Sequence, residues 1–280
     1  MRYDHPSTVQ EALALLARAP DSVLIAGATD FYPAQGLRPV TRPVIDLSGI
    51  DEARTITATA DGIRIGALAT WTDIAKAALP PAFCCLQLAA RQVGAVQIQN
   101  VGTIGGNLCN ASPAADGVPP LLCLDARVEL SSVDGVRVLP LEHFILGNRK
   151  TARDPGEIVT AILIPGRAGA CASTFLKLGA RSSLVISIAM VAVLLEADAA
   201  GRVAHAAVAV GACSAVAQRL SALEADLRGH LLSPALAERA MAAHLSPLSP
   251  IQDLRGTPEY RLDTALTMIR RGLAEVGGLV

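Results

Sequence analysis

Blocks of apolar residues separated by polar turns divide the chain into short helices and strands. Near the start, apolar residues at positions 9, 13, 16 and 17 have helical spacing, and Ser7 with Gln10 fits a capping box before them. Apolar runs at 22–26 and 43–47 predict two short strands on either side of a polar stretch. The opening of the chain therefore predicts a small β-α-β unit.

The pattern then changes to hairpins and helices. Asp61-Gly62 and Asp134-Gly135 each separate two β-prone runs and predict hairpin turns. Pro165-Gly166-Arg167-Ala168-Gly169 is the best candidate for a linker at the end of this region. The predicted elements are strands at 55–58, 63–67, 127–132, 136–141 and 158–164 and helices at 72–78 and 82–93.

A third unit is predicted to begin near Cys171. The apolar run from Leu184 to Leu195 has 12 residues, so it is too short to span a bilayer and predicts a buried strand over 184–196. A turn at 199–201 and a strand over 203–210 complete an antiparallel pair. Helices are then predicted at 215–228, 234–244 and 260–271.

Charge and composition exclude several classes of protein. Lys and Arg number 24 against 25 Asp and Glu, which leaves no basic excess for binding nucleic acid. Hydrophobic residues make up 51% of the chain, enough for a large core, while no apolar run is long enough for a membrane span. The first residues carry no secretory signal, so we expect a cytoplasmic protein.

Cysteine and histidine do not predict a metal centre. The six cysteines form no C-x-x-C pair, and their spacing matches neither a zinc site nor an iron–sulfur ligand set. Their small and apolar neighbours predict buried, reduced thiols with a packing role. The five histidines are scattered without helical pairing. If the protein handles electrons, a cofactor that needs no cysteine ligands must carry them.

The first segment with chemical content is Gly27-Ala28-Thr29-Asp30, which directly follows a predicted strand. Small side chains let an anion approach free backbone N–H groups, and the Thr29 hydroxyl adds a donor. This combination is typical of a phosphate-binding nest. A strand that ends in Ala-Gly is also common in ordinary turns, so the loop alone leaves both interpretations open.

The second segment, 97–116, is rich in Gly, Asn, Ser and Pro. Its glycines and short polar side chains suit a loop that surrounds a polar ligand through main-chain N–H groups. It matches neither G-x-G-x-x-G nor a Walker A sequence, and no strand–loop–helix arrangement is predicted around it. On composition alone, an ordered surface loop is an equal alternative.

Three motifs in order resemble one protein family. The run Thr-Ile-Gly-Gly-Asn-x-x-x-Ala-Ser-Pro-x-x-Asp at 103–116 resembles the FAD-binding subunit of the xanthine dehydrogenase and aerobic carbon monoxide dehydrogenase family of molybdenum hydroxylases. Ala-Gly-x-Thr-Asp at 26–30 resembles its other FAD loop, and Asp-x-Arg-Gly-x-x-x-Tyr-Arg at 253–261 resembles its C-terminal signature. The resemblance spans essentially the whole chain.

This resemblance implies an α+β fold. An FAD-binding domain of the vanillyl-alcohol-oxidase type would cover 1–168, with two α/β subdomains at about 1–55 and 56–168. A C-terminal α+β domain, a small three-stranded antiparallel sheet with helices, would cover 169–280. The cofactor-binding residues that it implies are Ala26, Gly27, Ala28, Thr29, Asp30, Val93, Thr103, Ile104, Gly105, Gly106, Asn107, Ala111, Asp116, Lys177 and Ile186.

Two departures from the family pattern bear on the flavin site. Many members have two glycines where this chain has Gly27-Ala28, and an alanine serves there if its φ is negative. Many members also carry Asp followed by Ile or Tyr near the flavin ring, where this chain has Val185-Ile186. Ile186 is then the expected apolar cover, and the CO-oxidising branch is less favoured.

The resemblance also implies a function and partners. This chain would bind FAD, receive electrons from [2Fe–2S] clusters on a small subunit, and pass them to an acceptor such as NAD⁺ or oxygen. The substrate would react at molybdopterin on a large partner subunit, in an assembly expected to be a dimer of heterotrimers. A self-sufficient flavin oxidase of the same fold is the main alternative. A non-catalytic nucleotide-binding regulator is the third.

Overall fold

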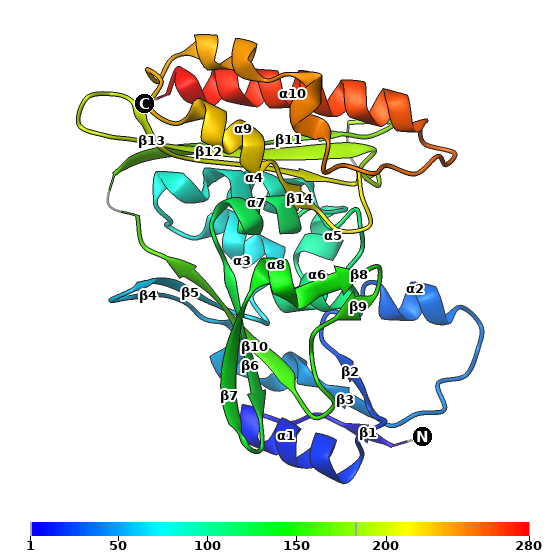
Figure 1. Ribbon diagram of the computed structural model, residues 1–280. Coiled ribbons are helices and arrows are strands. Elements are labelled where there is room, and N and C mark those ends of the chain that lie inside the picture. The colour runs from blue at the N-terminus through cyan, green and yellow to red at the C-terminus, as the bar shows by residue number, and fades with distance from the viewer. Residues whose placement is uncertain (1, 168, 183, 280) are drawn as a thin grey trace.

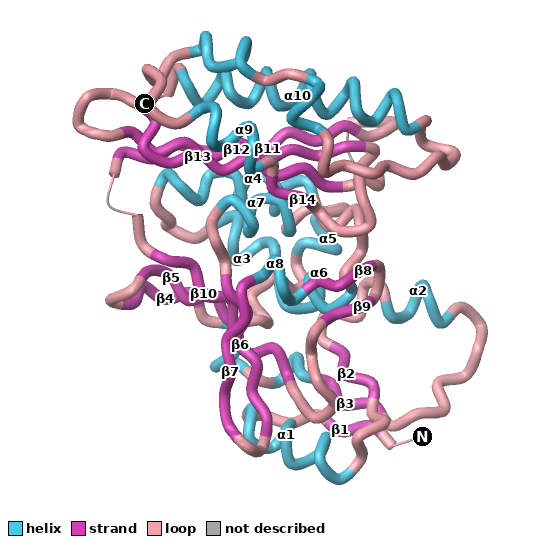
Figure 2. Tube along the Cα trace, viewed as in Figure 1, coloured by secondary structure: helices cyan, strands magenta, loops and turns pink. Residues whose placement is uncertain are grey.

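The computed structural model describes residues 2–167, 169–182 and 184–279. Three sheets follow one another along the length of the molecule, each with helices packed beside it (Figure 1). The N-terminus lies at the end of the molecule formed by the first sheet, and the C-terminus lies by the third (Figure 2). In the described ranges, no helix combines the length and apolar character needed to cross a membrane.

The first sheet is parallel, with strand order β1-β3-β2, and helix α1 packs near it. The cap of α1 differs from the predicted one, because Thr8 accepts from the Glu11 amide while the Glu11 carboxylate accepts from Ser7. Thr8 and Glu11 have the capping spacing of three residues, and Gln10 is not used. The elements are β1 (Tyr3–Asp4), α1 (Val9–Arg18), β2 (Val23–Ile25), α2 (Phe31–Gln35) and β3 (Val44–Asp46).

The second sheet is antiparallel, with order β4-β5-β10-β6-β7, and contains both predicted hairpins. Two 3-10 turns precede it, η1 (Leu47–Gly49) and η2 (Asp51–Arg54), and a third, η3 (Pro81–Phe83), precedes α4. Its strands are β4 (Ile56–Thr59), β5 (Gly62–Gly66), β6 (Arg127–Ser132), β7 (Gly135–Pro140) and β10 (Ile158–Pro165). Its helices and accessory hairpin are α3 (Trp71–Lys76), α4 (Cys84–Gln92), α5 (Val96–Gln99), α6 (Ile104–Asn110), α7 (Val118–Cys123), α8 (Leu141–Phe144), β8 (Ile145–Gly147) and β9 (Lys150–Thr151).

Helix α6 lies inside the segment that the sequence predicted as a loop, so that prediction was wrong. Two adjacent glycines lower the helical propensity and hide the periodicity. The helix forms because the Thr103 hydroxyl caps it by accepting from the Gly106 amide, and because Ile104 and Leu108 are fully buried. It ends at Ala111, whose left-handed backbone (φ 47°) closes the last turn.

The third sheet is antiparallel and has four strands in the order β11-β12-β13-β14, one more than predicted. The extra strand has two residues and replaces the start of the helix predicted at 215–228. The helix predicted at 234–244 is two 3-10 segments, while that at 260–271 extends in both directions. The elements are β11 (Ala170–Leu178), β12 (Ala189–Ala197), β13 (Val203–Gly211), β14 (Gln218–Arg219), α9 (Ser221–Leu227), η4 (Pro234–Arg239), η5 (Ala242–Leu245) and α10 (Pro258–Gly277).

Strand β12 is an inner strand of the third sheet, and helices cover both faces of this sheet (Figure 1). Residues 189–195 are all fully buried. Met190, Ala192 and Leu194 pack toward α4 and α7, while the intervening residues pack toward α9 and α10. Burial on both faces explains a continuous apolar run. The strand begins five residues later than predicted, since Leu184 has a left-handed backbone (φ 53°) and is half exposed.

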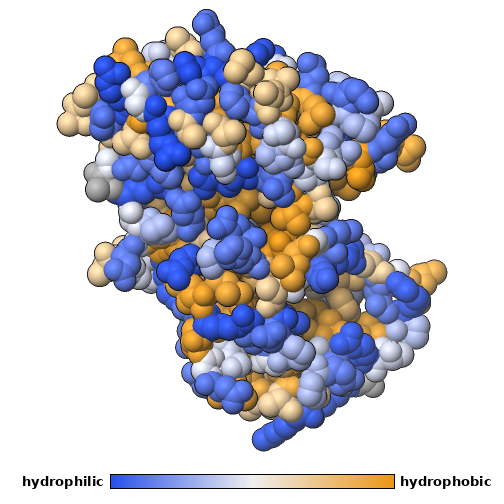
Figure 3. Space-filling model, viewed as in Figure 1, coloured by the Kyte–Doolittle hydropathy of each residue, from blue (hydrophilic) through white to orange (hydrophobic). Residues whose placement is uncertain are grey.

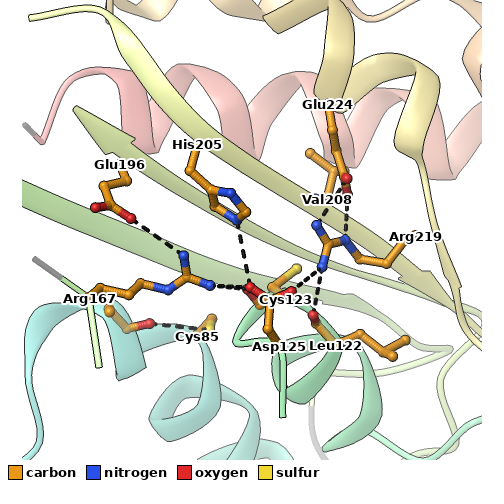
Figure 4. Close-up of polar contacts among 11 residues, drawn as sticks. Cys85, Leu122, Cys123, Asp125, Arg167, Glu196, His205, Val208, Arg219 and Glu224 are labelled. Atoms are coloured by element: carbon orange, nitrogen blue, oxygen red, sulfur yellow. Dashed lines mark hydrogen bonds and ion pairs between the residues drawn. The ribbon is translucent and has the colours of Figure 1, made fainter. Parts of the chain in front are cut away.

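An ion-pair network joins the second and third sheets at Asp125, two residues after the end of α7 (Figure 4). One Asp125 oxygen accepts from Arg219 at 2.9 Å, and the other accepts from Arg167 at 2.7 Å. Arg219 also pairs in a bidentate manner with Glu224 of α9, and Arg167 lies 3.4 Å from Glu196 of β12. The network therefore links α7, the segment after β10, and three elements of the last third of the chain.

His205 on β13 faces this network, with its Nε2 3.8 Å from Asp125 Oδ2 and no hydrogen-bond partner among the described residues. Partial burial lowers its pKa, the Arg167 and Arg219 charges act in the same direction, and Asp125 and Glu196 oppose them. The neutral imidazole is therefore the form that fits the folded protein. Below the ordinary His pKa of about 6.5, the unfolded chain binds the proton more readily and folding loses stability.

We expect His205→Asn to make the protein less sensitive to acid. Between pH 7.5 and 5.5 the melting temperature should fall less in the variant than in the parent protein, because one proton-linked cost of folding is gone. Differential scanning calorimetry at both pH values measures this. His143→Asn, a change at an exposed histidine on α8, is the control and should leave the difference unchanged. An equal fall in parent and His205 variant would contradict the expectation.

Candidate functional site

A cleft of about 520 Å³ separates the N-terminal part of the chain from α5 and α6. A second hollow of about 380 Å³ continues it toward β10 and shares the lining residues Ala26, Thr103, Gly106 and Arg149. We call the two together the two-loop cleft, because residues 26–30 and 102–107 meet there. The space-filling view shows this side of the molecule hollowed between its lower and middle parts (Figure 3).

The first loop, Gly27 to Asp30, has four successive backbone amides for which the described residues provide no hydrogen-bond acceptor. Ala28 has a left-handed backbone with φ 53°, so the condition of a negative φ for an alanine at this position is not met. A left-handed residue between right-handed or extended ones turns neighbouring N–H groups toward a common point, which is the geometry of an anion nest. The loop therefore offers unpaired donors at the wall of the cleft.

Ala28 is expected to tolerate glycine but not valine. A β-branched residue in this region of φ is strongly disfavoured, so Ala28→Val should lower the free energy of unfolding by about 1–3 kcal/mol. Ala28→Gly relieves strain and loosens the unfolded chain, so its effect should stay within about 1 kcal/mol. Chemical denaturation measures both. Ala58→Val, at an exposed site of strand β4, is the matched control and should be nearly neutral.

Gly27 is required because the second loop passes directly against it. A Cβ atom at this position would lie 1.8 Å from the Val101 carbonyl oxygen and 2.9 Å from the Gly102 nitrogen. Both contacts are with backbone, which cannot rotate away as a side chain does. The close approach holds the two loops together at the floor of the cleft.

Most amides of the second loop donate to other groups of the protein, whereas the sequence suggested a loop that surrounds a ligand through main-chain N–H groups and short side chains. Gly105 donates to the Ala67 carbonyl at 2.8 Å, and Gly106 donates to the Thr103 hydroxyl at 3.1 Å. What this loop leaves unpaired is a side chain: the Asn107 Oδ1 is buried and has no hydrogen-bond partner within the described ranges. Asn107 lines the cleft, so a donor group of a ligand could satisfy this oxygen.

Asp116 and Lys177 form a buried ion pair behind the cleft wall. Lys177 Nζ lies 2.6 Å from one Asp116 oxygen and also donates to the Gln92 carbonyl at 3.2 Å. The other Asp116 oxygen accepts from the Ser187 hydroxyl at 2.6 Å. Burial raises the pKa of Asp116, and the ammonium and the hydroxyl counteract it. Gln92 precedes Val93, which lines the cleft, so the pair supports that wall from behind.

The structure brings ten of the sequence-predicted site residues to the two-loop cleft and places five elsewhere. Of those five, Ile104 and Ala111 are buried core residues, Asp116 and Lys177 form the ion pair just described, and Ile186 is half exposed. The lining residues are Ala26, Gly27, Ala28, Thr29, Asp30, Val93, Thr103, Gly105, Gly106 and Asn107.

Sequence reasoning missed the four arginines of the cleft. Arg38, Arg42, Arg149 and Arg153 line it, and they come from four separate positions along two segments. No motif contains them, so only the arrangement of the chain in space reveals the cluster. Trp71 also lines the cleft, but it is almost completely buried and contributes mainly to the core.

The cysteines follow the prediction in part. Cys85, Cys123 and Cys213 are buried, and burial raises the pKa of the Cys85 thiol to about 12. Cys84 and Cys109 are exposed, which the apolar character of their neighbours did not indicate. Cys109 reaches the cleft because it lies on the outer face of the unpredicted helix α6.

The C-terminal motif is built around one buried arginine. Arg261 donates to the main-chain carbonyls of Ile188 at 2.5 Å and Ala212 at 3.0 Å, and to Asp253 at 2.7 Å. It thereby ties the start of α10 to the ends of two strands. Its role in this structure is to fix the C-terminal helix.

Two family models together match most of the chain. Residues 1–167 match the family model described as the FAD binding domain in molybdopterin dehydrogenase, and residues 174–276 match the CO dehydrogenase flavoprotein C-terminal domain. The nicotine 6-hydroxylase medium subunit of Paenarthrobacter nicotinovorans is 32% identical, over 99% of this chain and 97% of that protein.

Two further comparisons agree with these matches. A putative xanthine dehydrogenase FAD-binding subunit of Escherichia coli K12 is 30% identical, over 98% of this chain and 94% of that protein. A solved structure of carbon monoxide dehydrogenase from Hydrogenophaga pseudoflava superposes with a TM-score of 0.88 at 28% identity, covering 99% of this chain and 96% of that one.

Proposed function

Because this chain belongs to the family of FAD-binding subunits of molybdopterin dehydrogenases, we propose that it holds FAD in the two-loop cleft for a molybdenum hydroxylase. Such a subunit is part of an oxidoreductase whose substrate site lies on a partner chain. The observation that carries the proposal is the row of four amides from Gly27 to Asp30 at the cleft wall, for which the described residues provide no acceptor. They are donors suited to a pyrophosphate.

Other residues would bind the rest of the cofactor. Thr103, Gly105, Gly106 and Asn107 line the same cleft, and the unpartnered Asn107 oxygen is an acceptor for a hydroxyl donor. Val93, Asp116, Lys177 and Ile186 would lie at the flavin end, with Ile104 and Ala111 supporting α6. In this proposal the ion pair acts by holding the wall at Val93 rather than through contact from within the cleft.

Family membership supports an electron route, which is the remaining part of the proposal. FAD, when bound, would supply the redox chemistry. Electrons would arrive from [2Fe–2S] clusters on a small subunit and leave to NAD⁺ or oxygen. A large subunit would carry molybdopterin, in a dimer of heterotrimers. The first two sheets would correspond to the two subdomains of a vanillyl-alcohol-oxidase-type FAD domain.

Purification of the chain tests the proposal. The proposal requires a yellow protein, or a colourless one that regains a flavin spectrum when FAD is added. Co-expression with the proposed small iron–sulfur subunit and large molybdopterin subunit should then give a complex that contains iron, sulfide and molybdenum. A chain that takes up no FAD would refute the proposal. A flavoprotein that oxidises a small substrate without partners would indicate a self-sufficient oxidase instead.

A further inference from the structure

The two-loop cleft is strongly cationic. Arg38, Arg42, Arg149 and Arg153 line it, against Asp30 as the one carboxylate among the described lining residues. Three of these guanidinium groups donate to main-chain carbonyls and are held in place by them. Arg149 alone has no side-chain hydrogen bond or ion pair within the described ranges, and it is exposed. It also lines both hollows of the cleft.

The backbone at Arg149 is unusual for an arginine. Asn148 and Arg149 form the two-residue loop of the β8–β9 hairpin, where Gly147 pairs with Lys150. Arg149 has φ 56°, a position in a turn that glycine or asparagine normally occupies. Its amide donates to the Ala111 carbonyl at 3.2 Å, which fixes the hairpin tip against the end of α6. Arg149 thus places a long, positively charged side chain beside the cleft from a strained backbone position.

We propose that the Arg149 guanidinium neutralises the pyrophosphate of the dinucleotide bound in the two-loop cleft. The inference rests on the proposed function and adds a residue that none of the sequence motifs contains. The amides of 27–30 supply partial positive charge, but a pyrophosphate carries full negative charges. A free guanidinium offers a full charge and a bidentate donor pair for phosphate oxygens.

The other three arginines are less suited to this role than Arg149. Each of them already donates to a carbonyl, so moving its head group would break a bond within the protein. Arg149 is fixed through its backbone, and its head group makes no bond to the residues that the structure describes. Because the backbone of Arg149 is already fixed, binding a phosphate through its head group costs less conformational entropy than ordering the whole residue.

The pyrophosphate could belong to FAD itself or to a dinucleotide acceptor such as NAD⁺. The experiment therefore titrates the full-length chain twice: FAD into cofactor-stripped protein, followed by flavin fluorescence, and NAD⁺ into FAD-loaded protein, followed by the flavin absorbance. The variants are Arg149→Asn, which keeps the left-handed backbone, and Arg149→Lys, which keeps the charge. Lys150→Asn, one residue away and outside the cleft lining, is the matched control.

For FAD we expect a dissociation constant about tenfold higher in Arg149→Asn, a smaller rise in Arg149→Lys, and less than about a twofold change in Lys150→Asn. A rise confined to NAD⁺ would assign the same contact to the acceptor's pyrophosphate. If Arg149→Asn binds both dinucleotides as the parent protein does, with an unchanged melting temperature, the inference is wrong. A parent protein that binds no FAD would instead overturn the proposed function.

Discussion

Gly27→Ala is expected to remove FAD binding, with an affinity loss of at least about a hundredfold. The added methyl group would lie 1.8 Å from the Val101 carbonyl oxygen, so the two loops must separate by more than an ångström. Separation would disperse the amides of 27–30 and displace Asn107, which lines the same cleft. Equilibrium titration with FAD, followed by flavin fluorescence, measures the loss.

The same substitution should destabilise the cofactor-free protein by about 1–3 kcal/mol, because the clash is present without a ligand. Gly166→Ala is the control, since a methyl group there would meet its neighbours at ordinary distances of 3.6 Å and beyond. It should bind FAD as the parent does. A Gly27→Ala protein with unchanged FAD affinity would show that the loops do not form the cofactor site.

Lys177→Met is expected to have the largest effect on stability. It leaves the Asp116 carboxylate buried with only the Ser187 hydroxyl for compensation, and an unpaired buried charge costs about 3–5 kcal/mol. The melting temperature should fall by roughly 6–15 °C for a chain of this size. Because the pKa of Asp116 is already raised by burial, the variant should also recover part of its stability as the pH falls and the carboxyl protonates.

The double variant Lys177→Met with Asp116→Leu separates charge from packing. Removing both charges avoids the buried unpaired group, so its stability should return to within about 1–2 kcal/mol of the parent. Lys76→Met, at an exposed site on α3, is the control for loss of a lysine and should be nearly neutral. If the single and double variants melt at the same temperature, the ion pair does not stabilise this wall in the way described.

The two hairpins and the centre of strand β12 could be predicted, because their turn residues and apolar runs are visible in the local sequence. The Asp61-Gly62 and Asp134-Gly135 hairpins formed because the turn residues and the β-prone runs on either side favour the same structure. Strand β12 was predicted at its centre, because burial on both faces leaves a continuous apolar run. Its start was misplaced, since the run continues through Leu184 and Ile186, which are apolar but half exposed.

Features that depend on distant contacts escaped prediction. Helix α6 exists because Ile104 and Leu108 enter the core and Thr103 caps it, although its two glycines disfavour a helix. No local signal encodes the left-handed backbone of Ala28 or the close approach of Val101 to Gly27. The arginines of the cleft come from residues 38–42 and 149–153, and only the folded chain brings these two segments to one cleft.

The central claim is that the two-loop cleft of this chain binds one FAD. The most direct test is a titration of the cofactor-stripped, full-length protein with FAD, with the bound flavin separated and counted. We expect saturation at about one FAD per chain, and no saturable binding in the Gly27→Ala protein. No uptake by the parent protein, or equal uptake by Gly27→Ala and the parent, would contradict the account.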